Sequence, residues 1–503
     1  MINFNKNSKK EEISEKEGVS VKRNSTDTED KNLEKKSEKG VEKRSEKEIE
    51  EKMEKHRALF ERYEERLKDL DYELITPEDE IAFKEAFMHA KEIFEPEELV
   101  SWFKIKAEPF YRAGAWELLL PLYKELLEIV EKKPGPESPE TASVLVGLGG
   151  VYRYRGNYEE ALRLFSRALR ICENLPAGSQ PETGDTLSEF GFLYYLMDRY
   201  EEALPFYTQA LEIQEKFLSP ENLGAVRTLN RIAFLYKGLE KPEMAEEYFR
   251  KALKLLEMLQ EREPDNRVIM GYRAGTLNNL GVLLSEMGKL DEAEDRYGQA
   301  LKLEEKRYGS EHPQMAQTLN NLALLYFQTT RYEKAMILYT RSLEIMEKFG
   351  KTEHVGFATT LNNLAGVYVQ KGRYEKALEL YTRALEIRER ILGPDNPEVA
   401  KTLNNLGELY RILGQHKIAL PLYTRALKIY ETSFGPTHPD IGTTLNNLAG
   451  LHESMGEYET AIDLYEKALD IIEKEYGPDH PYFKITRNNL IGLYEKMERS
   501  WRS

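Results

Sequence analysis

The sequence has little of what marks disulfide-bonded, membrane-spanning or nucleic-acid-binding proteins. One of its 503 residues is a cysteine, Cys172, which excludes a disulfide framework and a cysteine-based zinc site. It has no apolar run of transmembrane length, and the first ten residues lack the apolar stretch of a secretory signal. The net charge of −16 argues against nucleic acid as the main partner. These absences predict a soluble, acidic, cytoplasmic protein with no membrane partner.

Motifs for catalysis and for cofactor binding are also missing. The sequence holds neither a GxxxxGK[ST] loop nor an HExxH helix, and its glycine cluster at 147–150 falls inside a helical pattern. His312, His438 and His480 each precede a proline, one per linking segment, whereas a metal site needs two or three converging ligands. We therefore predict a non-catalytic protein without a metal ion or cofactor.

What the sequence does have is a repeat. A five-residue word such as YTRAL recurs, and its copies begin at Tyr123, Phe165, Tyr207, Phe249, Tyr297, Tyr339, Tyr381, Tyr423 and Tyr465. Successive copies are 42 residues apart, except for one step of 48 that marks a six-residue insertion near 260–275. A second word, TLNNL, keeps the same period from Thr276 to Thr444. A fixed period of this length is typical of a solenoid built from stacked units.

Each unit is predicted to hold two helices. In the unit that starts at Thr359, helix-spaced apolar residues form two stripes: Leu361, Leu364, Ala365 and Tyr368, then Ala377, Leu380, Tyr381, Ala384 and Leu385. Gly372 separates them and suits a left-handed turn. The sequence therefore predicts an all-α solenoid of about nine helix–turn–helix units, closed by a capping helix near the C-terminus.

This pattern resembles the tetratricopeptide repeat (TPR), in the 42-residue form found in kinesin light chains. The words LNNLAxxY and GxYxxAxxLYxRAL carry the resemblance, which covers residues 98–497. The resemblance implies a right-handed superhelix with a concave groove. In this family the first helix of each pair lines the groove, which binds peptides or partner proteins.

The remaining segments give the domain organisation. Residues 1–45 are rich in charge and poor in apolar side chains, which predicts a disordered tail. Residues 46–97 are predicted to be helical, residues 98–497 to form the solenoid with a degenerate first unit, and residues 498–503 to be a short tail. The helical segment carries a brief heptad pattern at Ile49, Met53, His56, Phe60, Tyr63, Leu67, Leu70 and Leu74. This pattern suits either an amphipathic helix folded onto the first unit or a weak homodimer.

Asparagine recurs in the middle of the first helices, where it is a poor helix former. We predict that the second asparagine of each pair faces the groove and binds a peptide backbone: Asn279, Asn321, Asn363, Asn405 and Asn447. The alternative is a structural ladder in which asparagines bond neighbouring helices.

The N-terminal half of the predicted groove carries cations and aromatics instead of asparagine. These candidate binding residues are Arg153, Phe192, Tyr195, Arg227, Arg231, Phe234 and Lys237. We hypothesise that they select an acidic, aromatic-containing peptide by ion pairing and stacking. The alternative is that the cations pair with carboxylates of neighbouring helices.

The favoured function is thus a protein-binding scaffold with a peptide or protein ligand. The alternative is a self-assembling structural protein that dimerises through the heptad segment.

Overall fold

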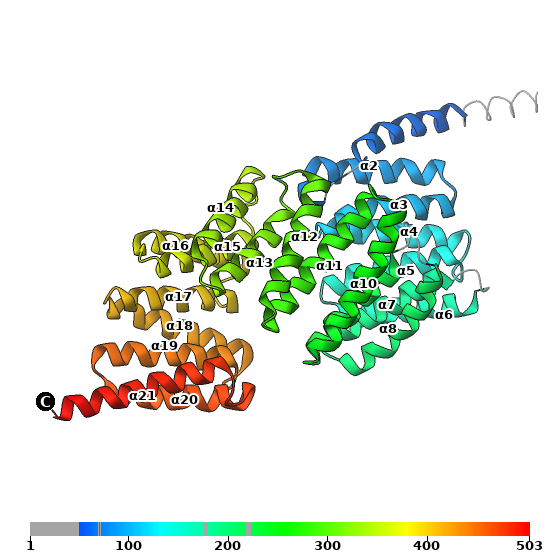
Figure 1. Ribbon diagram of the computed structural model, residues 1–503. Coiled ribbons are helices and arrows are strands. Elements are labelled where there is room, and N and C mark those ends of the chain that lie inside the picture. Colours follow the sequence, from blue (N-terminus) through cyan, green and yellow to red (C-terminus); the bar gives the residue numbers. More distant parts are fainter. Residues whose placement is uncertain (1–49, 69, 71, 176–179, 218–222, 503) are drawn as a thin grey trace, which may run out of the picture. The chain divides into compact units, whose positions relative to one another are not determined.

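The computed structural model describes residues 50–68, 70, 72–175, 180–217 and 223–502. The predicted tail 1–45 and heptad position Ile49 lie outside the described residues. The described chain consists of helices and connecting turns, without a strand (Figure 1). It divides into two compact units, one comprising residues 50–68 and 76–106, the other residues 70–75 and 107 onward.

The smaller unit contains the heptad positions from Met53 to Leu67, whereas Leu70 and Leu74 belong to the larger unit. Its elements are a helix at 50–66, α2 (Pro77–Ile93) and the first part of α3 (Pro96–Arg112). Phe60 is 9% exposed, and its ring centroid lies 5.1 Å from that of Phe94 and 5.5 Å from that of Trp102. Leu67 is also buried. Phe60 is therefore covered within the unit, which is the packing expected of an amphipathic helix folded onto its neighbours.

The larger unit is a stack of helix pairs (Figure 1). Its helices, after the short η1 (Tyr72–Leu74) and the end of α3, are α4 (Trp116–Lys132), α5 (Pro139–Tyr154), α6 (Tyr158–Asn174), α7 (Gln180–Leu196), α8 (Tyr200–Gln214), α9 (Gly224–Gly238), α10 (Pro242–Arg262), α11 (Arg267–Glu286), α12 (Leu290–Tyr308), α13 (Met315–Gln328), α14 (Tyr332–Lys348), α15 (Val355–Gln370), α16 (Tyr374–Leu392), α17 (Pro397–Ile412), α18 (His416–Phe434), α19 (Pro439–Met455), α20 (Tyr458–Tyr476) and α21 (Pro481–Arg502). A 3₁₀ turn, η3 (Glu215–Phe217), follows α8. Each helix packs on its successor, and the odd-numbered helices, such as α11, α13 and α15, also contact one another.

The predicted core stripes are buried. Leu361, Leu364 and Ala365 are at most 4% exposed on α15, and Ala377 and Ala384 are fully buried on α16. These residues pack between successive helices, so the apolar core runs along the stack instead of closing within one pair.

Two glycine positions show why small residues recur. At Gly281 on α11, an added Cβ would lie 2.7 Å from the ring of Tyr297 on α12, so the aromatic of the repeated word fills the place of a side chain. Gly372 adopts a φ of 68°, the left-handed conformation predicted for the turn between α15 and α16.

The insertion lengthens helices and does not form a loop of its own. Helix α10 has 21 residues and α11 has 20, whereas α13, the first helix of the next pair, has 14. The six extra residues near 260–275 therefore extend the end of α10 and the start of α11.

Candidate functional site

The asparagines of adjacent first helices are joined by hydrogen bonds. Nδ2 of the second asparagine in one unit donates to Oδ1 of the first asparagine in the preceding unit. Asn321 bonds Asn278 over 3.1 Å, and Asn405 bonds Asn362 over 3.1 Å. The same bond joins Asn489 to Asn446 over 3.0 Å and Asn363 to Asn320 over 3.5 Å. This asparagine ladder is the structural alternative that the sequence left open, and it accounts for asparagine in mid-helix.

The predicted peptide-binding asparagines keep part of their amide group available. Asn279, Asn321, Asn363, Asn405 and Asn447 are all half-buried. Of the first asparagines, Asn278 and Asn362 are buried, and Asn320, Asn404 and Asn446 are half-buried as well. An amide offers two N–H groups and a carbonyl oxygen, and one ladder bond uses a single N–H group. The ladder and a ligand contact are therefore compatible on the same side chain.

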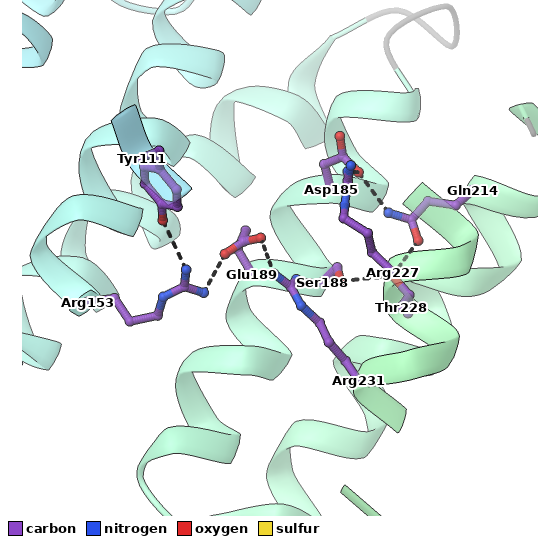
Figure 2. A network of polar contacts seen from close by, with 9 residues as sticks. All are labelled: Tyr111, Arg153, Asp185, Ser188, Glu189, Gln214, Arg227, Thr228 and Arg231. Carbon is purple, nitrogen blue, oxygen red and sulfur yellow. Dashed lines mark hydrogen bonds and ion pairs between the residues drawn. The ribbon is translucent and has the colours of Figure 1, made fainter. Parts of the chain in front are cut away.

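The predicted cations of the N-terminal half pair with carboxylates on neighbouring helices (Figure 2). Arg153 Nη1 lies 2.5 Å from Glu189, and Arg231 Nη2 lies 2.6 Å from the other oxygen of the same carboxylate. Arg227 pairs with Asp185 over 3.1 Å, and Lys237 pairs with Glu286 over 2.7 Å. This pairing is the alternative stated in the sequence analysis, in which the cations pair with carboxylates of neighbouring helices.

Glu189 holds this cluster together electrostatically. Burial raises the pKa of its carboxyl, but the guanidinium groups of Arg231 and Arg153 outweigh burial and hold the pKa at about 2. Arg153, which is 2% exposed, also donates to the Tyr111 hydroxyl over 3.1 Å. Because Glu189 stays ionised at neutral pH, its two arginine partners have their counter-charge inside the protein.

The predicted aromatics are part of the same packing. Phe192 lies between two guanidinium groups, with Arg153 4.4 Å and Arg231 4.7 Å from its ring centroid. Tyr195 stacks beside Phe192, and Phe234 packs edge-on against the buried Phe249. These rings are half-buried and contact residues of this chain.

Sequence reasoning missed the partners that complete the network. Asp185 accepts from both Arg227 and Gln214, and the Gln214 carbonyl oxygen accepts from Thr228 over 2.6 Å (Figure 2). The signal was present, since Asp185 lies 42 residues before Arg227, one repeat away at the same position. The abundance of acidic residues in this chain hid it.

A cavity of about 620 Å³ lies within the larger unit, at the insertion. It is lined by Tyr72, Glu108, Arg112, Arg227, Asn230, Val268, Met270, Gly271, Tyr272, Ala274, Gly275, Thr276, Asn278, Asn279, Glu304, Arg307, Tyr308, Gln314, Gln317 and Thr318. Two predicted site residues, Arg227 and Asn279, are therefore brought to one cavity, while the later asparagines follow along the stack.

Glu304 is the unusual residue of the cavity wall. It is 8% exposed, and its Oε1 accepts from the Thr318 hydroxyl over 2.9 Å. Its Oε2 is buried and has no hydrogen-bond partner among the described residues. Burial raises the pKa of Glu304 to about 7, although the bond from Thr318 lowers it.

The described residues show no cluster that could hold a metal ion. His438 instead caps α19 by accepting from the backbone of Asp440, and His480 accepts from the backbone of Tyr482 in the same way. Within the same described part, no helix has the length and apolar character needed to cross a membrane.

The stacked helix pairs define a helical-repeat solenoid. A tetratricopeptide-repeat sequence profile matches residues 106–174, 182–258, 272–348, 356–432 and 433–502, well over half of the chain. The chain therefore belongs to the tetratricopeptide repeat family.

Solved structures with similar repeats cover parts of the chain. BtubC (BKLC) from P. vanneervenii is 27% identical with a TM-score of 0.41, over 48% of this chain and 94% of its own. Kinesin light chain TPR-like repeats from Podosopora anserina are 23% identical with a TM-score of 0.35, over 40% and 95%. A signal transduction ATPase with a tetratricopeptide repeat sensor, from Pyrococcus horikoshii, is 18% identical with a TM-score of 0.49, over 79% and 52%. Comparison with curated proteins found no match.

Proposed function

We propose that this chain is a non-catalytic scaffold that binds an extended peptide, or an extended segment of a partner protein, along its first helices. Tetratricopeptide repeats generally mediate protein–protein interaction, and that family membership supports the class of function. The observation that carries the proposal is the row of half-buried second asparagines, one in each of the five successive units from Asn279 to Asn447.

The ladder bond prepares these side chains for a ligand. Asn321, Asn363 and Asn405 each have one N–H group fixed by the preceding unit, so the amide is already oriented before a ligand arrives. A side chain held in its binding geometry loses less conformational entropy on binding. Neighbouring packed helices lie about 8–10 Å apart, a spacing that an extended peptide spans with about three residues.

Any selectivity for an acidic ligand would come from the cationic side chains that a ligand can reach. Arg227 and Lys237 are 39% and 38% exposed at their side chains, so a ligand carboxylate can approach them. Arg153 and Arg231 are more buried and share Glu189, so a ligand would have to displace a buried ion pair there. We therefore assign any acidic preference to Arg227 and Lys237.

A peptide-display selection against the full chain tests the proposal. The test variant combines Asn321→Ala, Asn363→Ala and Asn405→Ala. The matched control combines Asn278→Ala, Asn320→Ala and Asn362→Ala, because it removes the same three ladder bonds from the acceptor side. We expect the wild type and the control to select a shared peptide pattern that the test variant loses. Equal loss in both variants, or no selected pattern with folded wild-type protein, would overturn the proposal.

A further inference from the structure

One side-chain position of the second helix can be compared across all units. Residues at this position are Val130, Cys172, Gln214, Leu256, Glu304, Met346, Arg388, Tyr430 and Ile472, each one repeat from the next. Every one of them is buried, with at most 8% exposure. The units therefore show which different side chains this one buried position of the second helix can hold.

Where this position is polar, the structure provides matching partners. The Gln214 carbonyl oxygen accepts from Thr228 over 2.6 Å, and its amide nitrogen donates to Asp185 over 2.8 Å. Arg388 donates to Thr402 over 2.7 Å and forms an ion pair with Glu398 over 2.8 Å. Gln214 and Arg388 therefore each have hydrogen-bond or ion-pair partners that match their own donors, acceptors and charge.

Glu304 differs from both. It makes the same bond to a threonine fourteen residues later, Thr318, but no cation of the described residues pairs with it and its Oε2 has no partner. Burying a carboxyl group without compensation is costly. The fold does not require it, because Leu256 and Met346 fill the same place in the adjacent units.

The cavity at Glu304 coincides with the one irregularity of the repeat. Val268, Gly271 and Tyr272 belong to the part of α11 that the insertion extends, and all three line the cavity. At Gly271 an added Cβ would lie 1.5 Å from the guanidinium of Arg307, so a larger residue would displace that arginine. A volume of about 620 Å³ is within the range of small-molecule sites, which hold about 300–1,000 Å³.

The charges around the cavity restrict the ligand. Guanidinium groups of Arg112, Arg227 and Arg307 line it together with the carboxyl groups of Glu108 and Glu304. Arg112 lies 3.8 Å from Glu108, and Arg227 lies 3.1 Å from Asp185. The three arginines outnumber the two carboxyl groups of the wall, which disfavours a simple cation, and a simple anion would leave Glu304 without a donor. A molecule that carries both charges satisfies both parts of the wall.

We propose that the Glu304 cavity binds a zwitterionic ligand, a free amino acid or a short unblocked peptide. The ligand's ammonium group pairs with the Glu304 carboxylate, and its carboxylate faces Arg112, Arg227 and Arg307. This site shares Arg227 and Asn279 with the extended-peptide site proposed above, whereas Glu304 belongs to the cavity alone.

Equilibrium dialysis of the full chain with defined ligand pools, read by mass spectrometry at pH 8, tests this proposal. The pools are the free amino acids, unblocked tripeptides, the same tripeptides N-acetylated, and the same tripeptides C-amidated. We expect retention of amino acids or unblocked tripeptides, and the comparison of these two pools identifies the source of the zwitterion. Each blocked form should bind at least about tenfold more weakly, as expected from losing a hydrogen bond to a charged group.

Glu304→Gln is the matched variant, since Gln214 occupies the same position and keeps the bond to its threonine. We expect it to reduce binding of the unblocked ligand about tenfold and to leave the N-acetylated ligand unchanged. If its thermal unfolding shows a damaged fold, Glu304→Met replaces it, because Met346 is the occupant one unit later.

Three results would overturn the assignment: no retained zwitterion, equal retention of either blocked form, or undiminished binding by the folded variant. These results do not bear on the extended-peptide proposal, which is decided by the asparagine variants with internal peptide segments.

Discussion

At the scale of single residues, the half-buried Glu189 and the buried Glu304 make opposite contributions to stability. Glu189 has two arginine partners and a pKa of about 2, whereas Glu304 has one hydroxyl partner and a pKa of about 7. An acid whose pKa is lowered on folding stabilises the fold above its unfolded pKa. An acid whose pKa is raised stabilises it only while protonated. Glu189 therefore stabilises the folded protein at neutral pH, whereas Glu304 stabilises it only at acidic pH.

For Glu189, we expect Glu189→Gln to destabilise the protein by about 3 kcal/mol at pH 7. The reason is that Arg153, almost fully buried, loses its counter-charge. The contribution of Glu189 is complete above pH 4.5 and is lost as pH falls towards 2, so the variant should also lack this part of the acid destabilisation. Urea unfolding between pH 2.5 and 7 measures both effects.

The control for that experiment is Glu160→Gln. Glu160 pairs with Arg163 on the surface of α6, where both side chains are at least 36% exposed. We expect a cost below about 0.5 kcal/mol. A similar cost at both sites would contradict the role given to Glu189.

For Glu304, we expect stability to fall as pH rises from 4.5 through 7, because the folded protein must ionise a buried carboxyl that the unfolded chain ionises freely. Between these two pH values, the free energy of unfolding should fall by roughly 2–3 kcal/mol. Glu304→Gln should remove this slope and be more stable than the wild type at pH 8. Thermal unfolding of both proteins from pH 5 to pH 8 measures it, and parallel curves would refute the buried, unpartnered state of Glu304.

At the scale of helices, the asparagine ladder connects four pairs of successive units. We expect a double-mutant cycle on Asn362 and Asn405 to give a coupling of about 0.5–1.5 kcal/mol, the net value of one hydrogen bond. Asn404 and Asn447 are the matched control. They stand in the same relation, but Asn404 Oδ1 has no partner and Asn447 accepts from Asn446. Their coupling should be close to zero, and equal couplings would contradict the ladder.

The helices were predictable from the sequence and the polar partners were not. The stripes at Leu361 and Ala377 follow from a 3.6-residue period that any reader of the sequence can apply, and Gly372 follows from its place between them. A period of 42 residues also defines which helices are neighbours. It does not define which carboxylate meets which arginine, since that depends on the rotation of one helix against the next.

Glu304 was missed for a related physical reason. Its position is apolar in most units, so a single acidic residue there looks like one more charge on an acidic chain. Only the structure shows that the position is buried and that the insertion has opened a cavity beside it. The asparagines, in contrast, were found because they recur, although their bonds to each other required coordinates.

At the scale of the whole molecule, contacts between neighbouring helices dominate, so stability is close to a sum over units and their interfaces. We expect unfolding to depend on the probe. Trp102 lies in α3, and Trp116 at the start of α4 stacks on Tyr154, so with Trp501 replaced the tryptophan fluorescence reports this N-terminal part of the chain, whereas far-ultraviolet circular dichroism reports all helices. In a Trp501→Phe background, the two urea midpoints should differ by about 0.5 M, equivalent to about 1 kcal/mol. Coincident transitions would indicate one cooperative unit.

The ladder also bears on how such an array can change its length. Every rung joins residues 43 positions apart, whether it connects Asn278 with Asn321 or Asn446 with Asn489. Duplicating or deleting a 42-residue block within the ladder keeps this spacing of 43 residues at the new junction. Where the step is 48, Asn230 bonds Thr276 instead of an asparagine, and both residues line the cavity. A change in length by whole units therefore preserves the spacing on which the ladder depends, whereas an insertion of six residues does not.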